Sequence, residues 1–321
     1  MKSRFLLVLA VFFPLSLYCQ QLNDLASTFS IVALDPATGE FGVGVQSHWF
    51  SVGQVVPWAE AGVGAVATQS FVEVSYGPKG LGLMKQGKTA SDALEELLNE
   101  DSLSAVRQVA MIDAKGSVAT HTGASCISYA GHRTGKNYSV QGNLLASPMV
   151  WEEMAKAFEN TTGSLADRIL AALEAGQAAG GDARGRQSAA LIVVRQVSDT
   201  EPWKNRVVDL RVEDSISPIK ELRRVYDLHR AYEWANKGDE HFAEKDYEKA
   251  LQAYNMALSI VPENDELIFW RGSMYMQMGK REEAVRDVQI AVNLNPRWRI
   301  LLERLPDEIF PAAKWVATQL R

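Results

Sequence analysis

The chain of 321 residues is short of cysteine, basic clusters and catalytic motifs. Two cysteines are too few for a disulfide framework, so stability must come from packing. No run of Lys or Arg exceeds two residues and the net charge is −6, which argues against a nucleic acid partner. The five histidines show no metal-ligand spacing, and G-x-S-x-G, H-E-x-x-H, Walker and C-x-x-C motifs are absent. We therefore expect neither a metal nor a cofactor.

The N-terminus has the pattern of a signal peptide, residues 1–19. Lys2 and Arg4 precede an apolar run, Phe5–Leu17, that is too short for a stable membrane span. Cleavage after Cys19 predicts an exported protein, periplasmic or extracellular, with one remaining cysteine and no internal disulfide. The alternative is a lipoprotein anchored at Cys19. The residue before Cys19 is Tyr18, however, whereas lipid-attachment signals have a small residue at that position.

Alternating apolar residues over the first two thirds of the chain predict strands, and helical patterns interrupt them. Strands are expected at Thr28–Leu34, Phe41–Ser47, Gly62–Gln69, Val106–Asp113, Val118–Cys126, Ser188–Arg195 and Arg206–Val212. Helices are expected at Gly77–Gln86, Thr89–Asn99, Pro148–Asn160 and Ser164–Ala175. This order of elements predicts an α+β domain with helices outside antiparallel sheets.

From Ala231 the sequence repeats with a period of 34. The matching pairs are Gly238 and Gly272, Ala250 and Ala284, Ala257 and Ala291, and Pro262 and Pro296. Small residues where two helices cross, followed by a helix-ending proline, are typical of tetratricopeptide repeats. We expect two repeats over residues 231–298, a capping helix within 299–321, and a linking segment at Ile219–Tyr232. The concave groove of such an all-α array binds a protein or peptide partner.

Thr28 carries the chemistry that the sequence indicates most directly. Processing just before it would place a hydroxyl and the α-amino group on one residue. The α-amino group has a reference pKa near 8, so an unprotonated fraction at neutral pH can take the proton of the hydroxyl. Two alternatives remain open. A cut after Ala26 would present Ser27 instead, and Thr28 would have no catalytic role if it merely begins an edge strand.

Several separated motifs resemble an uncharacterised family, a domain of unknown function in the N-terminal-nucleophile (Ntn) hydrolase superfamily. These motifs are Thr28–Ala33, Gly42–Phe50, Val55–Trp58, Ala61–Gln69, Ser75–Pro78, Arg107–Gln108, Gly142–Leu144 and Gly180–Ala190. The resemblance covers residues 28–222 and implies a four-layer αββα sandwich. By analogy with the superfamily, it also implies hydrolysis of an amide bond by an N-terminal nucleophile.

Other polar residues are candidates to assist Thr28. Ser47 and His48 end the second strand, which we expect beside the first; His48 would tune the amine or bind substrate, or have no role. Asn143 would donate its side-chain amide to a developing oxyanion, or be a turn residue that satisfies its own hydrogen bonds. Gln69, at the end of the third strand, is a weaker candidate.

Asp182 and Arg184 lie in a glycine-rich loop that allows a sharp turn. This pair would hold a substrate carboxylate or orient the amine, or it would be a structural ion pair that braces the strand entrance.

Two functions from different classes follow. The first is a secreted amidohydrolase in which Thr28 attacks an amide or acyl carbonyl, its own α-amine acts as base, and the repeats bind a partner. The alternative is a non-catalytic binding or scaffold protein that acts through its repeats. The substrate and the oligomeric state, including a homo-oligomer, stay open.

Overall fold

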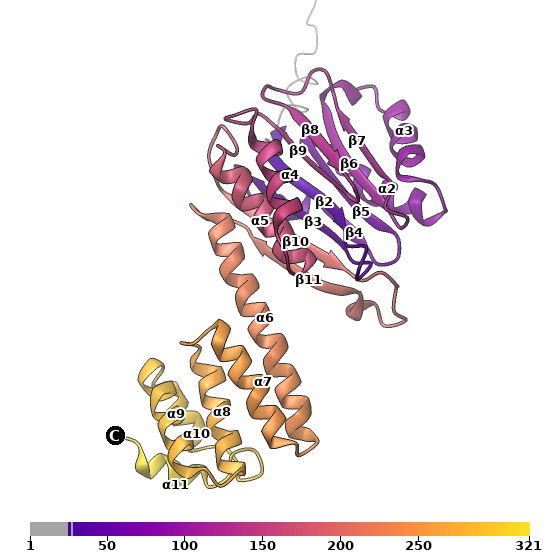
Figure 1. Ribbon diagram of the computed structural model, residues 1–321. Helices are drawn as coiled ribbons and strands as arrows, with labels where there is room; N and C mark the ends of the chain where they lie inside the picture. Colours follow the sequence, from indigo (N-terminus) through magenta and orange to yellow (C-terminus); the bar gives the residue numbers. More distant parts are fainter. Residues whose placement is uncertain (1–24, 27) are drawn as a thin grey trace, which may run out of the picture. The chain divides into compact units, whose positions relative to one another are not determined.

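The computed structural model describes residues 25–26 and 28–321 (Figure 1). The predicted signal peptide, the alternative anchor at Cys19 and the alternative nucleophile Ser27 lie outside the described residues. Among the described helices, none is long and apolar enough to cross a membrane. The chain divides into two compact units, one ending at Leu222 and the other beginning at Arg223.

Two antiparallel sheets form the centre of the first unit. One sheet has the order β11-β10-β3-β2-β9-β8, and the other has the order β1-β5-β6-β7 with β4 also paired to β5. The strands are β1 (Leu25–Ala26), β2 (Thr28–Leu34), β3 (Phe41–Ser47), β4 (Pro57–Glu60), β5 (Gly64–Phe71), β6 (Arg107–Asp113), β7 (Val118–Thr122), β8 (Gly131–Gly135), β9 (Tyr138–Asn143), β10 (Ser188–Val194) and β11 (Arg206–Val212). Short 3-10 helices occupy Val52–Gln54, Ser104–Val106 and Pro202–Asn205.

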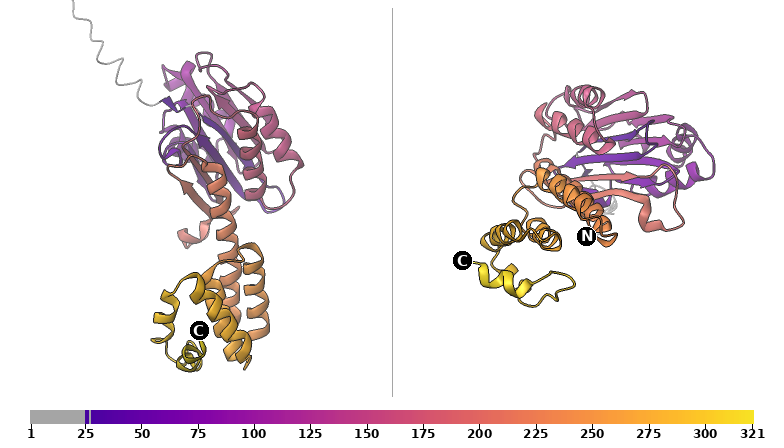
Figure 2. Two further views of the ribbon diagram at one scale, coloured as in Figure 1. Left: turned by 90° about the vertical axis from the view of Figure 1, so that its left-hand side faces the viewer. Right: turned by 60° about the horizontal axis from the view of Figure 1, so that its bottom comes forward.

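Two pairs of helices cover the outer faces of these sheets. Helices α2 (Tyr76–Lys85) and α3 (Ala90–Glu100) pack on the sheet that contains β5, β6 and β7. Helices α4 (Val150–Asn160) and α5 (Leu165–Ala178) pack on the sheet that contains β2, β3 and β9 (Figures 1 and 2). The predicted α+β class and the αββα layers are confirmed.

Glycines in β3 explain why α5 lies so close to its sheet. A Cβ atom at Gly42 or Gly44 would approach the side chain of Ile169 to 2.4 Å. Ser164 begins α5 with a capping box to Asp167, as its sequence predicts. On the inner faces of the two sheets, side chains including Val43, Val45 and Ile112 form an apolar core.

The structure corrects several expected elements. Strand β9 was not predicted, and Asn143 ends this strand rather than sitting in a turn. Thr28 does not begin an edge strand, because β2 lies between β3 and β9. Helix α5 continues past Gly176, whose missing side chain leaves room for Met154 and Phe29 instead of ending the helix.

The second unit is an array of helices, as the repeats predict. Its elements are α6 (Pro218–Ala243), which begins in the first unit, α7 (Tyr247–Ile260), α8 (Asp265–Gln277), α9 (Arg281–Leu294), α10 (Arg297–Leu302) and α11 (Ala313–Gln319). Gly238 lets α6 approach Tyr254, which a Cβ would meet at 2.5 Å, and Gly272 lets α8 approach Val288 in the same way. The expected linking segment is the first part of α6, and two short helices stand where one capping helix was expected.

A candidate active site at the start of strand β2

Thr28 is the first residue of β2 and lies opposite two other predicted site residues. Its Cα partners are Ser47 of β3 and Asn143 of β9. Side chains of directly paired residues point to the same face of a sheet, so all three face the space between the sheets. Thr28 Oγ1 donates to Ser47 Oγ over 3.1 Å. None of the three side chains is more than 1% exposed.

Gln69 approaches the same point from the opposite sheet. Its Nε2 donates to the backbone carbonyl oxygen of Thr28 over 3.2 Å, and its Oε1 accepts from the hydroxyl of Ser30 over 2.6 Å. The predicted candidate therefore lies at the site. Its hydrogen bond holds the backbone of Thr28, however, so Gln69 positions Thr28.

Gln108 of β6 is the centre of the polar network; the sequence analysis included it in a family motif but did not predict a role for it at the site. Its Oε1 accepts from Gln69 Nε2 over 2.7 Å and from Asn143 Nδ2 over 3.0 Å. Its Nε2 donates to the Thr122 hydroxyl and to the carbonyl oxygens of Gly131 and Gly142. Burying an amide costs free energy unless the amide has hydrogen-bond partners, and Gln108 is fully buried. A glutamine within the apolar stretch of β6 was therefore the sequence signal that could have pointed to this network.

The network extends from Thr122 toward the surface. Thr122 Oγ1 lies 2.8 Å from Nδ1 of His132, a side chain that stands on β8. Burial, and to a smaller extent the charge of His121, lowers the pKa of His132. His132 is therefore held toward its neutral form, in which Nδ1 can accept the hydrogen bond.

Asp182 is fully engaged in a loop next to Ser47. Its Oδ2 accepts from the backbone N–H of His48 over 2.7 Å, and its Oδ1 accepts from the backbone N–H of Arg184 over 2.8 Å. The guanidinium of Arg184 closes an ion pair with Asp182 at 3.1 Å. These bonds favour the structural reading of the pair, because a carboxylate saturated by the protein has little capacity left for a substrate.

His48 and Arg184 are the predicted site residues that reach solvent. His48 is exposed, and its Nδ1 lies 3.3 Å from the carbonyl oxygen of Arg186. The side chain of Arg184 is 27% exposed, whereas that of Asp182 is completely covered. A molecule that approaches the ends of β3 and the 182–186 loop would meet these two side chains first.

The chain before Thr28 takes part in the other sheet. Leu25 and Ala26 form β1, which pairs with Phe71 and Ser70 of β5. In this continuous chain the nitrogen of Thr28 belongs to a peptide bond and cannot act as a base. Within the described residues, no group of three or more His, Cys, Asp or Glu side chains is placed to hold a metal ion.

Comparison with known proteins assigns the first unit. A model of a family of unknown function, DUF1028, matches residues 28–222. The chain belongs to this family. The crystal structure of a DUF1028 protein from Silicibacter pomeroyi is 31% identical, with a TM-score of 0.56 over 62% of this chain and 88% of that one. The DUF1028 domain thus coincides with the αββα sandwich.

A tetratricopeptide repeat model matches residues 238–279 in the second unit. The protein STIP1 homolog of Dictyostelium discoideum is 32% identical over 72 residues, 22% of this chain and 13% of that protein. The heat-shock cognate co-chaperone sgt12 of Aspergillus fumigatus is 33% identical over 70 residues, 22% of this chain and 20% of that protein. The chain spans a fifth or less of the length of these two relatives. The DUF1028 domain is therefore followed by a tetratricopeptide repeat.

Proposed function

We propose that this protein is an exported amidohydrolase whose nucleophile is Thr28 after the chain has been cut between Ser27 and Thr28. The observation that carries the proposal is the constellation around Thr28. A hydroxyl that opens a central strand has Ser47 on one neighbouring strand, Asn143 on the other, and a buried amide network centred on Gln108 behind it.

The cut would convert the nitrogen of Thr28 from an amide into an α-amine. That amine would accept the proton of the Thr28 hydroxyl as the oxygen attacks an amide or similar acyl carbonyl. Collapse of the tetrahedral intermediate would break the C–N bond of the substrate, and the protonated α-amine would return its proton to the departing amine. Water, activated by the same α-amine, would then hydrolyse the Thr28 ester, which releases the acid and restores the threonine hydroxyl. Ser47, at 3.1 Å from Thr28 Oγ1, would hold the attacking oxygen in place.

Asn143 is the candidate donor to the developing oxyanion. Its side-chain Nδ2 donates a hydrogen bond to Gln108 Oε1 over 3.0 Å, on the face of the sheet that Thr28 shares. The bond also fixes the orientation of the amide, which an oxyanion donor requires. His48 and Arg184, both solvent-accessible, would contact the substrate, while Asp182 and Gln69 would position their neighbours.

The tetratricopeptide part would supply partner binding. One relative of this segment is named as a heat-shock protein cognate co-chaperone, and a co-chaperone works with another protein. Stacked helix pairs of such repeats create concave binding surfaces, and this chain has two pairs, α6 with α7 and α8 with α9, that would form one for a peptide.

The test begins with the N-terminus. The chain would be produced with an initiator methionine directly before Thr28, whose removal exposes the threonine, and a second version would retain Ala26 and Ser27. A fluorescent β-lactone, which acylates nucleophilic hydroxyls, would be added, and the labelled peptide identified by mass spectrometry. We expect labelling at Thr28 in the first version only.

Thr28→Ala and Thr28→Ser are the matched variants. Alanine should abolish labelling and turnover of an amide-substrate panel, whereas serine should retain both at a reduced rate. Turnover that survives in Thr28→Ala, or a mature protein with Gln20 or Gln21 as its sole first residue, would contradict the mechanism.

The alternative is a non-catalytic protein that acts through its repeats. Two observations favour it in the continuous chain, because Thr28 is fully buried and the residues before it are paired with β5. It predicts that the version starting at Thr28 shows no labelling while partner binding persists.

A further inference from the structure

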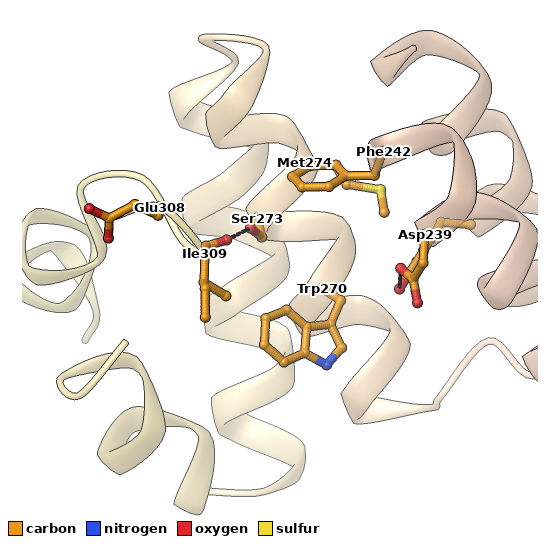
Figure 3. A pocket seen from close by; sticks show the side chains of 8 residues that line it. Asp239, Phe242, Trp270, Ser273, Met274, Glu308 and Ile309 are labelled. Atoms are coloured by element: carbon orange, nitrogen blue, oxygen red, sulfur yellow. Dashed lines mark hydrogen bonds between the residues drawn. The ribbon is translucent and has the colours of Figure 1, made fainter. Parts of the chain in front are cut away.

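A cavity of about 350 Å³ opens within the second unit (Figure 3). Its wall comes from α6, α7 and α8 and from the segment between α10 and α11. The lining residues are Asp239, Phe242, Tyr254, Trp270, Ser273, Met274, Glu308 and Ile309. This volume fits one large side chain with a little of its backbone.

Much of the lining is aromatic or apolar. Figure 3 shows Trp270 between Asp239 on one side and Ile309 on the other, with Phe242 and Met274 beyond it. Ser273 Oγ donates to the carbonyl oxygen of Ile309 over 2.8 Å, so the segment that closes the cavity is tied to α8. The cavity is therefore formed before any partner arrives, which reduces the entropy lost on binding.

The charged residues that line the cavity are all acidic. Asp239 and Glu308 are the charged residues of the lining, and none of the eight lining residues is a Lys or Arg. The carboxylate of Glu308 points away from Trp270 (Figure 3). Asp239 makes no ion pair among the described residues, and accepts a hydrogen bond from the Tyr254 hydroxyl over 2.8 Å. Burial raises the pKa of Asp239, the Tyr254 hydrogen bond opposes this, and the nearby charge of Glu266 adds to the rise. An uncompensated negative charge beside aromatic rings is a site for a cation.

We propose that this cavity binds a Lys or Arg side chain of an extended basic segment in a partner protein. The aliphatic stem would lie along Trp270 and Met274, and the charged head would reach the carboxylate of Asp239. Glu308, at the opposite part of the lining, would attract a second basic residue of the same segment. The inference rests on the proposed partner-binding function of the repeats and names the chemistry of the partner.

An acidic segment is the contrasting occupant. Its carboxylates would face Asp239 and Glu308 without a cation among the lining residues to compensate them, and like charges brought together oppose binding. The sign of the partner's charge is thus the property that the cavity selects.

Three fluorescein-labelled heptapeptides separate these cases. They share the same leucine and glycine positions and differ only in a pair of lysines, methionines or glutamates. Fluorescence polarisation with the full chain should give the order lysine, methionine, glutamate, with the lysine peptide at least about tenfold tighter than the glutamate peptide. Added salt should weaken the lysine peptide most.

Asp239→Asn is the decisive variant, because an asparagine oxygen can still accept the Tyr254 hydrogen bond and the fold should be kept. We expect the lysine peptide to bind about five- to tenfold more weakly and the methionine peptide to be unchanged. Glu263→Gln removes an exposed carboxylate in the loop after α7 and serves as the control, with no change expected.

The possible results distinguish the basic-partner inference from the broader proposal that the repeats bind a partner. Tighter binding of the glutamate or methionine peptide, or an Asp239→Asn variant that binds the lysine peptide like the parent chain, overturns the basic-partner inference and leaves partner binding intact. Absence of binding by all three peptides counts against both. The labelling of Thr28 is independent of either result.

Discussion

The hydroxyl of Thr28 donates a 3.1 Å hydrogen bond to the hydroxyl of Ser47, across two neighbouring strands and without exposure to solvent. The bond fixes the direction of the threonine oxygen at the point where β2 begins. In the proposed mechanism, Ser47 would therefore orient the nucleophile.

Ser47→Ala should therefore slow the reaction of Thr28. In the version that begins at Thr28, we expect β-lactone labelling to fall by about five- to tenfold, the value of one lost orienting hydrogen bond of about 1 kcal/mol. Ser139→Ala removes another buried serine hydroxyl from the same sheet, bonded to Gln141, and is the control. Equal labelling of the two variants would mean that Ser47 has only a structural role.

Two buried glutamines should respond to the same substitution in opposite ways. Gln108→Leu removes the acceptor of Gln69 and Asn143 and should lower the free energy of unfolding by about 3 kcal/mol, since two buried amides lose a partner. Gln46→Leu should be neutral or stabilising, because neither polar atom of Gln46 has a hydrogen-bond partner among the described residues. Calorimetric unfolding of both variants measures these changes. A large loss of unfolding free energy in Gln46→Leu would contradict the prediction.

The ion pair of Asp101 and Arg107 predicts an acid-dependent loss of stability. Burial alone would raise the pKa of Asp101, but hydrogen bonds from Arg107 and the Leu103 N–H outweigh it, so the pKa lies below its ordinary value. A carboxyl with a lowered folded pKa stabilises the fold above its unfolded pKa of about 3.9. This contribution disappears as the pH falls through the folded pKa.

Asp101→Asn should consequently cost about 2 kcal/mol at pH 7, where a buried Arg107 loses its counter-charge. The difference in Tm between parent and variant should narrow steadily as the pH is lowered below 4. A difference that stays constant down to about pH 2 would show that the charge of Asp101 does not carry the interaction.

Two glycines of α2 should also give opposite results. Gly82→Ala places a methyl group where no atom lies within 4 Å and should stabilise the protein by about 0.5–1 kcal/mol, because alanine favours the helix. Gly77→Ala would bring its Cβ to 2.3 Å from the indole of Trp58, and overpacking of this kind costs about 1–3 kcal/mol. Thermal unfolding of the two variants should show a rise in Tm for Gly82→Ala and a fall for Gly77→Ala. Similar shifts in Tm would refute the steric argument.

The sequence was most informative where physical patterns are periodic. The 34-residue repeat predicted the helical array because the small residues at Gly238 and Gly272 are required by helix crossing. Likewise, alternating apolar residues predicted β2, β3, β10 and β11, since buried sheets need apolar inner faces.

Strand β9 was not predicted because its inner face is polar rather than apolar. Its inner face carries Ser139, Gln141 and Asn143, which are buried in the polar network instead of in an apolar core. A pattern that expects buried residues to be apolar interprets such a strand as a loop. The role of Gln108 was hidden in the same way, because its five partners come from residues that are distant in the sequence.

The strand order has a consequence for when the site can exist. Thr28, Ser47, Gln69, Gln108 and Asn143 belong to five different strands, and β2 meets β9 only after most of the domain has been synthesised. A topology rich in contacts between such distant segments folds slowly. Thr28 therefore meets these neighbours only in the folded domain, so the proposed reaction would require folding as well as the cut before Thr28.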